Sequence, residues 1–369
     1  MVNDLNSTVD HLAEIVEALP TEEKALFRRI YRVTTATGEL RMPSSMTPWV
    51  RQQFGSVAAV TSQRITRVTN RVTGEESLFN ILRASRPVQA KDRQSVAAQL
   101  EEARRRDLFQ NPNDNTPADI FGRVAGKHCV TASNIAKYDE LHGVVIFNEF
   151  NPLHFTREQI IDYIDTGQEW ARRAHAANPA ARYFLFIWNC LWRAGASIHH
   201  GHAQVMLTSD RHYARVEGLR QAAQSYKQTY GSSYFADLFR VHHSAGCAME
   251  KAGVRILAHL TPFKDNEIML LADELNLPLK ESIYEALACF RDKLGACSFN
   301  LGLVTPPLSE TAESWESFPA MVRLVDRGDP DSRASDVGGM EIYGASVISS
   351  DPFKLARQLG QYLAPDLSG

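Results

Sequence analysis

The order of strands and helices constrains this chain most, because one order is predicted twice. In the first half, apolar strand segments flank a long helix that opens with capping-box spacing at Thr156-Arg157-Glu158-Gln159. In the second half, strand segments flank a helix predicted at residues 280–294. The repeated strand–strand–helix–strand–strand order predicts an α+β fold made of two related halves, each an antiparallel sheet with packed helices.

This repeat divides the chain into three predicted parts. Residues 1–55 are expected to form a helical N-terminal extension, residues 56–235 the first half, and residues 236–369 the second half. Residues 7–32 of the extension are predicted to form two helices, broken at Leu19-Pro20-Thr21. A β-hairpin with Thr73-Gly74 at its turn should then open the first half.

The first half contains an unusual strand at residues 197–207, in which His200, His202 and Gln204 occupy every second position. Side chains alternate along a strand, so all three should project from one face. An imidazole is a good nucleophile toward phosphorus, and a nearby amide can donate hydrogen bonds to phosphoryl oxygens. The pattern therefore indicates nucleotidyl transfer through a histidine, with buried structural histidines or a zinc or copper site as the alternatives. The matching segment of the second half, residues 321–326, has no histidine, so only the first half should carry the chemistry.

The composition is that of a globular protein. The chain has 369 residues, of which 44% are hydrophobic and 22% charged, and its net charge is −3, so no basic surface indicates a nucleic-acid partner. Its five cysteines form no C-x-x-C pair. The N-terminus does not resemble a secretory leader, and no apolar run reaches the ~20 residues of a membrane span. We therefore expect a soluble, cytoplasmic protein without a membrane partner.

Four further segments occur in a consistent order along the chain. They are Asn70–Gly74 followed by Arg83–Pro87, Gly143–Ile146 before the long helix, Asn189 with Gly195-Ala196-Ser197 before the histidine strand, and Val337–Ile342. Together they resemble the galactose-1-phosphate uridylyltransferase branch of the histidine-triad superfamily. Within that branch, the chain is most similar to the ADP-glucose phosphorylase-like members.

The resemblance implies an enzyme that works in two displacements. His202 would attack the α-phosphorus of a nucleotide sugar or dinucleoside polyphosphate, and a phosphate or sugar phosphate would then accept the nucleotidyl group from His202. The transferred group is expected to be adenylyl. The resemblance assigns catalytic roles to His202, Gln204 and His200. The residues expected to bind substrate are Asn70, Arg83, Arg86, Asn189, Gly195, Ala196 and Ser197.

The resemblance also bears on metal binding. In zinc-containing relatives the counterpart of His200 is a metal ligand, together with a C-x-x-C pair and another histidine. Here no C-x-x-C is present, and Asn151 stands at the position of that other histidine. We therefore expect no metal and no other cofactor, with zinc as the one group to test. The motif also reads H-G-H-A-Q instead of the uridylyltransferase-type H-P-H-G-Q.

Two other functions remain open from the sequence. The chain could be a dinucleoside polyphosphate hydrolase, or a nucleotide-binding protein without turnover. Transfer or phosphorolysis is favoured because Gln204 stands where hydrolytic histidine-triad proteins carry a third histidine. By analogy with the family, we expect a homodimer.

Overall fold

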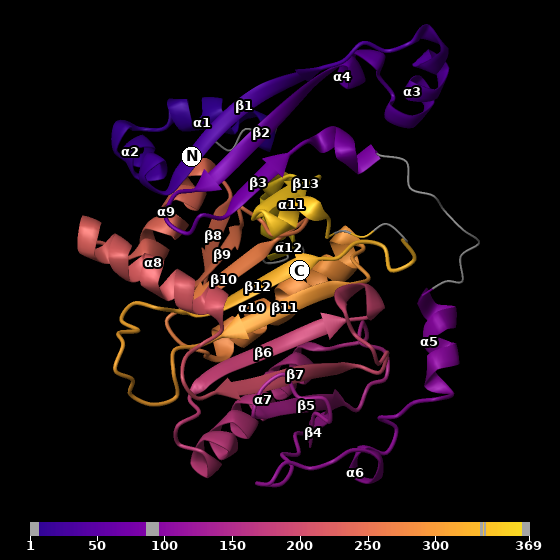
Figure 1. The fold of residues 1–369 in the computed structure, drawn as a ribbon, viewed down its shortest axis with the longest axis vertical. Helices are drawn as coiled ribbons and strands as arrows, with labels where there is room; N and C mark the ends of the chain where they lie inside the picture. Colours follow the sequence, from indigo (N-terminus) through magenta and orange to yellow (C-terminus); the bar gives the residue numbers. More distant parts are fainter. Residues whose placement is uncertain (1–6, 86–95, 333–334, 336, 364–369) are drawn as a thin grey trace, which may run out of the picture.

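The computed structural model describes residues 7–85, 96–332, 335 and 337–363 (Figure 1). Its centre is a nine-stranded sheet in which every neighbouring pair of strands is antiparallel. In sheet order, the strands are β4 (Cys129–Ser133), β5 (Leu141–Phe147), β7 (His202–Thr208), β6 (Tyr183–Cys190), β11 (Phe299–Val304), β12 (Ala320–Asp326), β10 (Ile268–Ala272), β9 (Val254–Ala258) and β8 (Ala248–Lys251).

The order of this sheet confirms the predicted repeat. Strands β4-β5-β7-β6 of the first half are mirrored by β9-β10-β12-β11 of the second half, with β8 added at one edge. The two halves share one continuous sheet, because β6 pairs with β11 from Leu185↔Val304 to Cys190↔Phe299. This pairing removes two exposed strand edges. It also places the histidine strand β7 one strand away from the junction.

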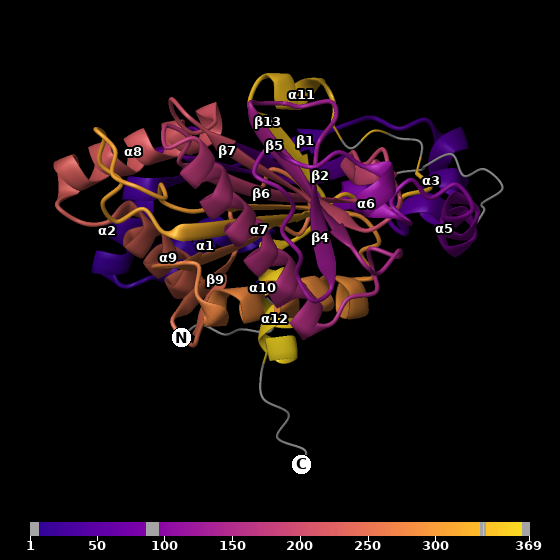
Figure 2. The ribbon, with the colours of Figure 1, turned by 90° about the horizontal axis from the view of Figure 1, so that it is seen from below.

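Helices α7 (Arg157–Ala177), α10 (Leu277–Cys289) and α12 (Pro352–Leu363) pack against one face of the sheet in one large core. Figure 2 shows α10 and α12 on one side of the sheet, and β13 with α11 on the other. Helix α7 opens with the predicted capping box at Thr156 and Gln159. It packs closely because Gly143 leaves room for Trp170, whose ring lies 2.7 Å from where a Cβ would stand.

A smaller sheet lies against the other face and is joined to it by a second apolar core. This sheet contains β1 (Tyr31–Glu39), β2 (Ser62–Asn70), β3 (Glu76–Phe79) and β13 (Ala345–Ile348). The helices in this core are α1 (Leu12–Ala18), α2 (Thr21–Ile30), α8 (Ala214–Tyr230) and α9 (Tyr234–Ala245).

Short helical segments and turns complete the described chain. They are η1 (Val9–His11), η2 (Ser44–Met46), α3 (Thr47–Phe54), α4 (Val57–Thr61), η3 (Ile81–Ser85), α5 (Val96–Arg104), α6 (Pro112–Asn115), η4 (Trp192–Ala194), η5 (Phe290–Leu294) and α11 (Gly339–Ile342). Within the described ranges, no helix combines the length and apolar character needed to cross a bilayer.

The N-terminal extension is only partly helical, which corrects the prediction. Helices α1 and α2 lie on either side of the expected break at Leu19-Pro20. Residues Tyr31–Glu39, however, form β1, which pairs with β2 along its whole length. The β-branched run from Val33 to Thr35 favours an extended backbone, and Tyr31 anchors the strand in the second core. The extension therefore supplies an edge strand to the smaller sheet.

Candidate active site

The candidate site residues of strand β7 lie on the face of the sheet opposite α7. Ala203 and Val205 are buried in the core that contains α7. Because side chains alternate along a strand, His202 and Gln204 point to the other face. Strand β5 pairs with β7 so that Ile146 lies opposite His202 and Val144 opposite Gln204. The histidine and the amide therefore share one surface of the sheet, as the spacing predicts.

The ring of His202 is held in one orientation. Its Nδ1 lies 2.8 Å from the backbone carbonyl oxygen of His200, which can only accept, so Nδ1 carries a proton and donates. Among the described residues no hydrogen bond reaches Nε2, which keeps its lone pair when the ring is neutral. Burial lowers the pKa of His202, although the bond to the His200 carbonyl opposes that shift. His202 is therefore poised as a neutral imidazole at pH 7.

Phe109 lies over this ring. Its side chain meets the ring of His202 edge-on, with centroids 5.5 Å apart, and also contacts His200. Phe109 forms a small apolar cluster with Ala132, Val144 and Ile146 on the same face of the sheet. This cover leaves only 9% of His202 exposed. Phe109 is thus one of the groups that bury His202, and burial lowers the pKa of that ring.

His200 uses both of its ring nitrogens in hydrogen bonds. Nδ1 lies 2.8 Å from Oδ2 of Asp107, and Nε2 lies 2.7 Å from the carbonyl oxygen of Phe147. Both partners are acceptors, so the protein engages both ring nitrogens of His200. The two side chains of this ion pair are only 7% and 6% exposed. The charge on His200 further lowers the pKa of His202.

These contacts do not fit zinc. A histidine ligand must direct one ring nitrogen at the metal, and both nitrogens of His200 already face oxygen acceptors of the protein. The Asn151 amide is bonded to His154 at 3.1 Å. Across the described part of the chain, no group of three His, Cys, Asp or Glu residues lies close enough together to hold a metal ion. The arrangement at His200 is therefore a hydrogen-bonded ion pair, and no step of the chemistry is assigned to a metal.

Gln204 is held by a histidine from the neighbouring strand. Its Oε1 lies 2.8 Å from Nε2 of His142, which is fully buried on β5. On the other side of β7, Ile187 of β6 lies opposite Gln204. The Gln204 amide therefore sits between two strands, with its carbonyl oxygen bound to the protein.

Asn189 is bound in a similar way. It lies on β6, two residues beyond Ile187 and so on the same face as Gln204. Asn300 of β11 places its Nδ2 2.7 Å from Oδ1 of Asn189 and 2.8 Å from the carbonyl oxygen of Ala194. Arg327 in turn donates to Oδ1 of Asn300 at 2.5 Å. The structure thus brings Asn189 to the surface that carries His202.

The loop between β6 and β7 contains the three small residues predicted to meet phosphate. Gly195 has a φ of 96°, a left-handed conformation that suits glycine. The backbone N–H groups of Gly195 and Ala196 donate to the carbonyl oxygens of Trp192 and Leu191, so both are already used within the loop. Ser197 is exposed and lines a cavity of about 360 Å³ beside His200. Of the three, only Ser197 lines this cavity.

The predicted arginines lie near a separate, larger cavity. Arg83, on η3, lines a cavity of about 850 Å³ together with Arg193 and Arg327. The Arg193 side chain donates to the carbonyl oxygen of Arg327, which joins this cavity to the β6–β7 loop. Arg86 lies outside the described residues.

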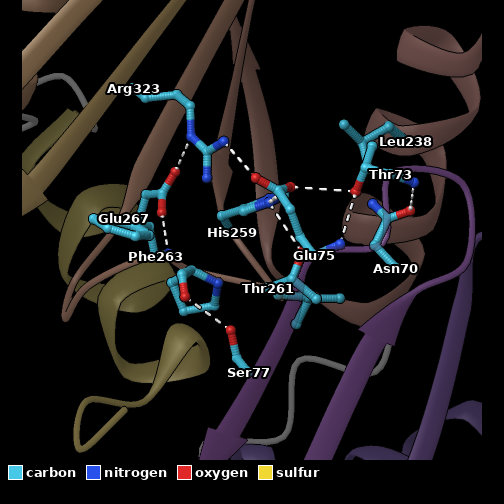
Figure 3. Close-up of polar contacts among 12 residues, drawn as sticks. Asn70, Thr73, Glu75, Ser77, Leu238, His259, Thr261, Phe263, Glu267 and Arg323 are labelled. Atoms are coloured by element: carbon cyan, nitrogen blue, oxygen red, sulfur yellow. Dashed lines mark hydrogen bonds and ion pairs between the residues drawn. The ribbon is translucent and has the colours of Figure 1, made fainter. Parts of the chain in front are cut away.

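Asn70 lies in a different environment. It is fully buried, with Oδ1 accepting from the backbone N–H groups of Val72 and Thr73, and Nδ2 donating to Tyr234. Its contacts give no support to a role in binding ribose or base. Figure 3 shows Asn70 and Thr73 beside a buried polar cluster.

That cluster is centred on Arg323 of β12, the strand that corresponds to the histidine strand in the second half. Arg323 bridges Glu267 and Glu75, with Nη1 of Arg323 2.6 Å from Oε1 of Glu75, and His259 lies 3.7 Å from the same carboxylate (Figure 3). The pKa of Glu75 is lowered chiefly by the charge of Arg323, against the effect of burial. The second half therefore uses this position for a structural ion cluster that joins β12 to the smaller sheet.

Four residues of the site were not found from the sequence: Asp107, Phe109, His142 and Asn300. Asp107 and Phe109 lie in a polar segment without periodicity, so only the folded chain brings them to the histidines. His142 did carry a signal, because a histidine within the apolar strand Leu141–Phe147 must find a polar partner.

Comparisons with known proteins agree with this fold. No protein-family model matches the sequence, and no curated protein matches it. Among solved structures, an ADP-glucose phosphorylase from Arabidopsis thaliana with bound ADP-glucose is similar at 17% identity, with a TM-score of 0.59 over 79% of this chain and 97% of that chain. A GalT-like protein from Arabidopsis thaliana matches at 16% identity and TM-score 0.58, with the same coverage. A uridylyltransferase matches at 16% identity and TM-score 0.53, over 82% of this chain and 99% of its own. The chain therefore has the fold of ADP-glucose phosphorylase and uridylyltransferase, as the resemblance of its motifs predicts.

Proposed function

We propose that the chain is a nucleotidyltransferase or phosphorylase that transfers a nucleoside monophosphate through a covalent intermediate on His202. The donor is a nucleotide sugar or a dinucleoside polyphosphate, and the acceptor is a phosphate or sugar phosphate. Adenylyl is the favoured group, because ADP-glucose is the nucleotide bound in a structure with the same fold. The observation that carries the proposal is the neutral ring of His202, anchored through Nδ1 and unbonded at Nε2.

In the first displacement, the lone pair of Nε2 forms a bond to the α-phosphorus of the donor. The bond from that phosphorus to the bridging oxygen breaks, and the sugar phosphate leaves with the electron pair. The ring becomes positively charged, and its Nδ1–H remains bonded to the carbonyl oxygen of His200, which stabilises that charge. No proton has to move, because the leaving group is already a phosphate anion.

In the second displacement, an oxygen of the acceptor phosphate attacks the same phosphorus and the P–N bond breaks. His202 returns to its neutral form. Gln204 can donate hydrogen bonds to the phosphoryl oxygens but cannot take a proton from water. This chemistry favours a phosphate acceptor over hydrolysis.

Isotope exchange tests the proposal. ADP-glucose is mixed with labelled glucose 1-phosphate in the absence of any other acceptor, and label entering ADP-glucose is measured. A covalent intermediate permits this exchange, because the first displacement is reversible. The His202→Asn variant should lose it. His199→Asn is the matched control, since that neighbouring histidine packs against Trp192 instead. Equal exchange by His202→Asn and the parent would refute the covalent route.

The cover formed by Phe109 favours one second candidate, a nucleotide-binding protein without turnover. Only 9% of His202 is exposed, and under this candidate a nucleotide binds in the cavity beside Ser197 without reaching the ring. Calorimetric binding of nucleotide sugars with no exchange across a panel of bases and sugars would support that candidate. Exchange with any member of the panel would exclude it and identify the substrate.

A further inference from the structure

His142 is an unusual residue for its place in the fold. It is fully buried on β5, among the residues Leu141–Phe147, all of which are buried. It belongs to neither the apolar clusters nor the motifs of the resemblance. A buried imidazole needs partners for both ring nitrogens, and the identity of those partners fixes where its proton lies.

The hydrogen bonds of His142 specify its tautomer. The backbone N–H of Tyr138 lies 2.9 Å from Nδ1, and a backbone N–H can only donate, so Nδ1 offers its lone pair. Burial lowers the pKa of His142, which keeps the ring neutral with its proton on Nε2. The Asn134 amide nitrogen lies 3.2 Å from Nε2 but has no lone pair to offer. Nε2–H therefore donates to Oε1 of Gln204, 2.8 Å away.

This bond determines which end of the Gln204 amide is free. If the amide were rotated by 180°, its NH₂ group would face the Nε2–H of His142 and two donors would meet. The observed orientation binds the carbonyl oxygen and leaves the Nε2 amide hydrogens available. Without this bond the amide could also turn its oxygen toward the substrate, whereas the bound amide presents only donors.

The Asn189 amide is fixed by the same logic from the other half of the sheet. Arg327 can only donate, so Oδ1 of Asn300 accepts from it and Nδ2 of Asn300 donates to Oδ1 of Asn189. The NH₂ group of Asn189 is therefore also the end left for a ligand. Both amides lie on the face that carries His202.

We propose that His142 is a positioning residue, which locks the Gln204 amide so that its NH₂ group faces the phosphoryl oxygens, while Asn300 does the same for Asn189. The amide orientation follows from the hydrogen bonds alone. Its effect on catalysis rests on the proposed function. Donors that are held in place before charge develops need no reorientation during the reaction, which is how preorganised sites stabilise an oxyanion.

Two measurements test this separately. Nitrogen NMR of the histidine-labelled native protein reports the tautomer of His142 without any turnover, with His142→Asn used to assign the signal. We expect Nε2–H. A ring protonated at Nδ1 would overturn the proposal whether or not the protein is an enzyme.

The kinetic test is a double-variant cycle. We expect His142→Leu to lower kcat for nucleotidyl transfer by about 100-fold, as loss of one oxyanion donor does, with little change in KM. His142→Asn, which keeps an N–H donor, should recover part of the rate. In the Gln204→Leu background, His142→Leu should have no further effect. An undiminished loss in that background would show that His142 acts otherwise, and His212→Leu, another buried histidine, controls for general destabilisation.

Discussion

Removing the ring of Phe109 should change how the rate of the proposed reaction falls at acidic pH. Burial is the largest cause of the lowered pKa of His202, and Phe109 is the aromatic side chain that contacts its ring. In Phe109→Ala, water reaches the imidazole, and the charged form is no longer disfavoured as strongly. The pKa of His202 should therefore rise toward its ordinary value of 6.5. More of His202, the proposed nucleophile, is then protonated at mildly acidic pH.

The substitution should also lower the free energy of unfolding, by an amount that follows from the burial of Phe109. Phe→Ala in a well-packed core costs about 3–5 kcal/mol. Phe109 is 9% exposed and shares its cluster with only three other buried residues. We therefore expect a loss at the lower end of that range, about 3 kcal/mol. A protein of this size should tolerate this loss at 25 °C.

The assay is the initial rate of isotope exchange between pH 5 and pH 8. The parent should keep its rate below pH 6.5, whereas Phe109→Ala should lose rate at a higher pH. Phe150→Ala is the matched control, because Phe150 is 8% exposed and contacts the ring of His200. It removes similar bulk without uncovering His202. If the exchange rate of Phe109→Ala and of the parent fell at the same pH, Phe109 would not be what lowers the pKa of His202.

Three further predictions concern stability and metal content. Burial lowers the pKa of His242 to about 3 in the folded protein, whereas its ordinary value of 6.5 applies to the unfolded chain. As the pH falls below 6.5, the unfolded chain therefore binds this proton and the folded protein does not. The free energy of unfolding should drop by about 2 kcal/mol by pH 5 because of His242. Urea unfolding at pH 7 and at pH 5 should show a smaller drop in the free energy of unfolding for His242→Gln than for the parent. An equal drop would contradict this role of His242. Gly201→Ala should destabilise the protein by about 1–3 kcal/mol, because the added Cβ would stand 2.9 Å from the Glu149 carbonyl oxygen. Gly302→Ala is the control, because a Cβ at Gly302 would meet no atom within 4 Å. Equal melting temperatures for the two variants would count against a close contact at Gly201. Because both nitrogens of His200 are occupied, treatment with a strong chelator should change neither melting temperature nor exchange rate, and restoration of a lost activity by zinc would be evidence against the ion pair.

Much of the fold could be predicted because its signals are local. The capping-box spacing at Thr156 predicts where α7 begins, and the helix does start at Arg157 with that capping box formed. The turn at Gly74 lies where the hairpin of β2 and β3 requires it, with a φ of 76°. Strand β1 was missed because its threonine-rich sequence resembles a polar connection, and only pairing with β2 makes it regular.

The site was predictable only where its residues share a strand. His202 and Gln204 are two residues apart, so their common face follows from the period of a strand. Asp107 is 93 residues from His200 in the sequence, and nothing local indicates that its carboxylate would stand where a metal ligand is expected. The bond between Asn189 and Asn300 likewise depends on the junction of the two halves, which local patterns do not specify.

The most direct measurement is a peptide map of the protein after it has reacted with ADP-glucose and been quenched in base, where a phosphorus–nitrogen bond to histidine survives. Tandem mass spectrometry should place one adenylyl group on the ring of His202. The modification should disappear on brief acid treatment or on addition of a phosphate acceptor before the quench. An adenylyl group on any other residue, or turnover of ADP-glucose with His202 never modified, would contradict the account.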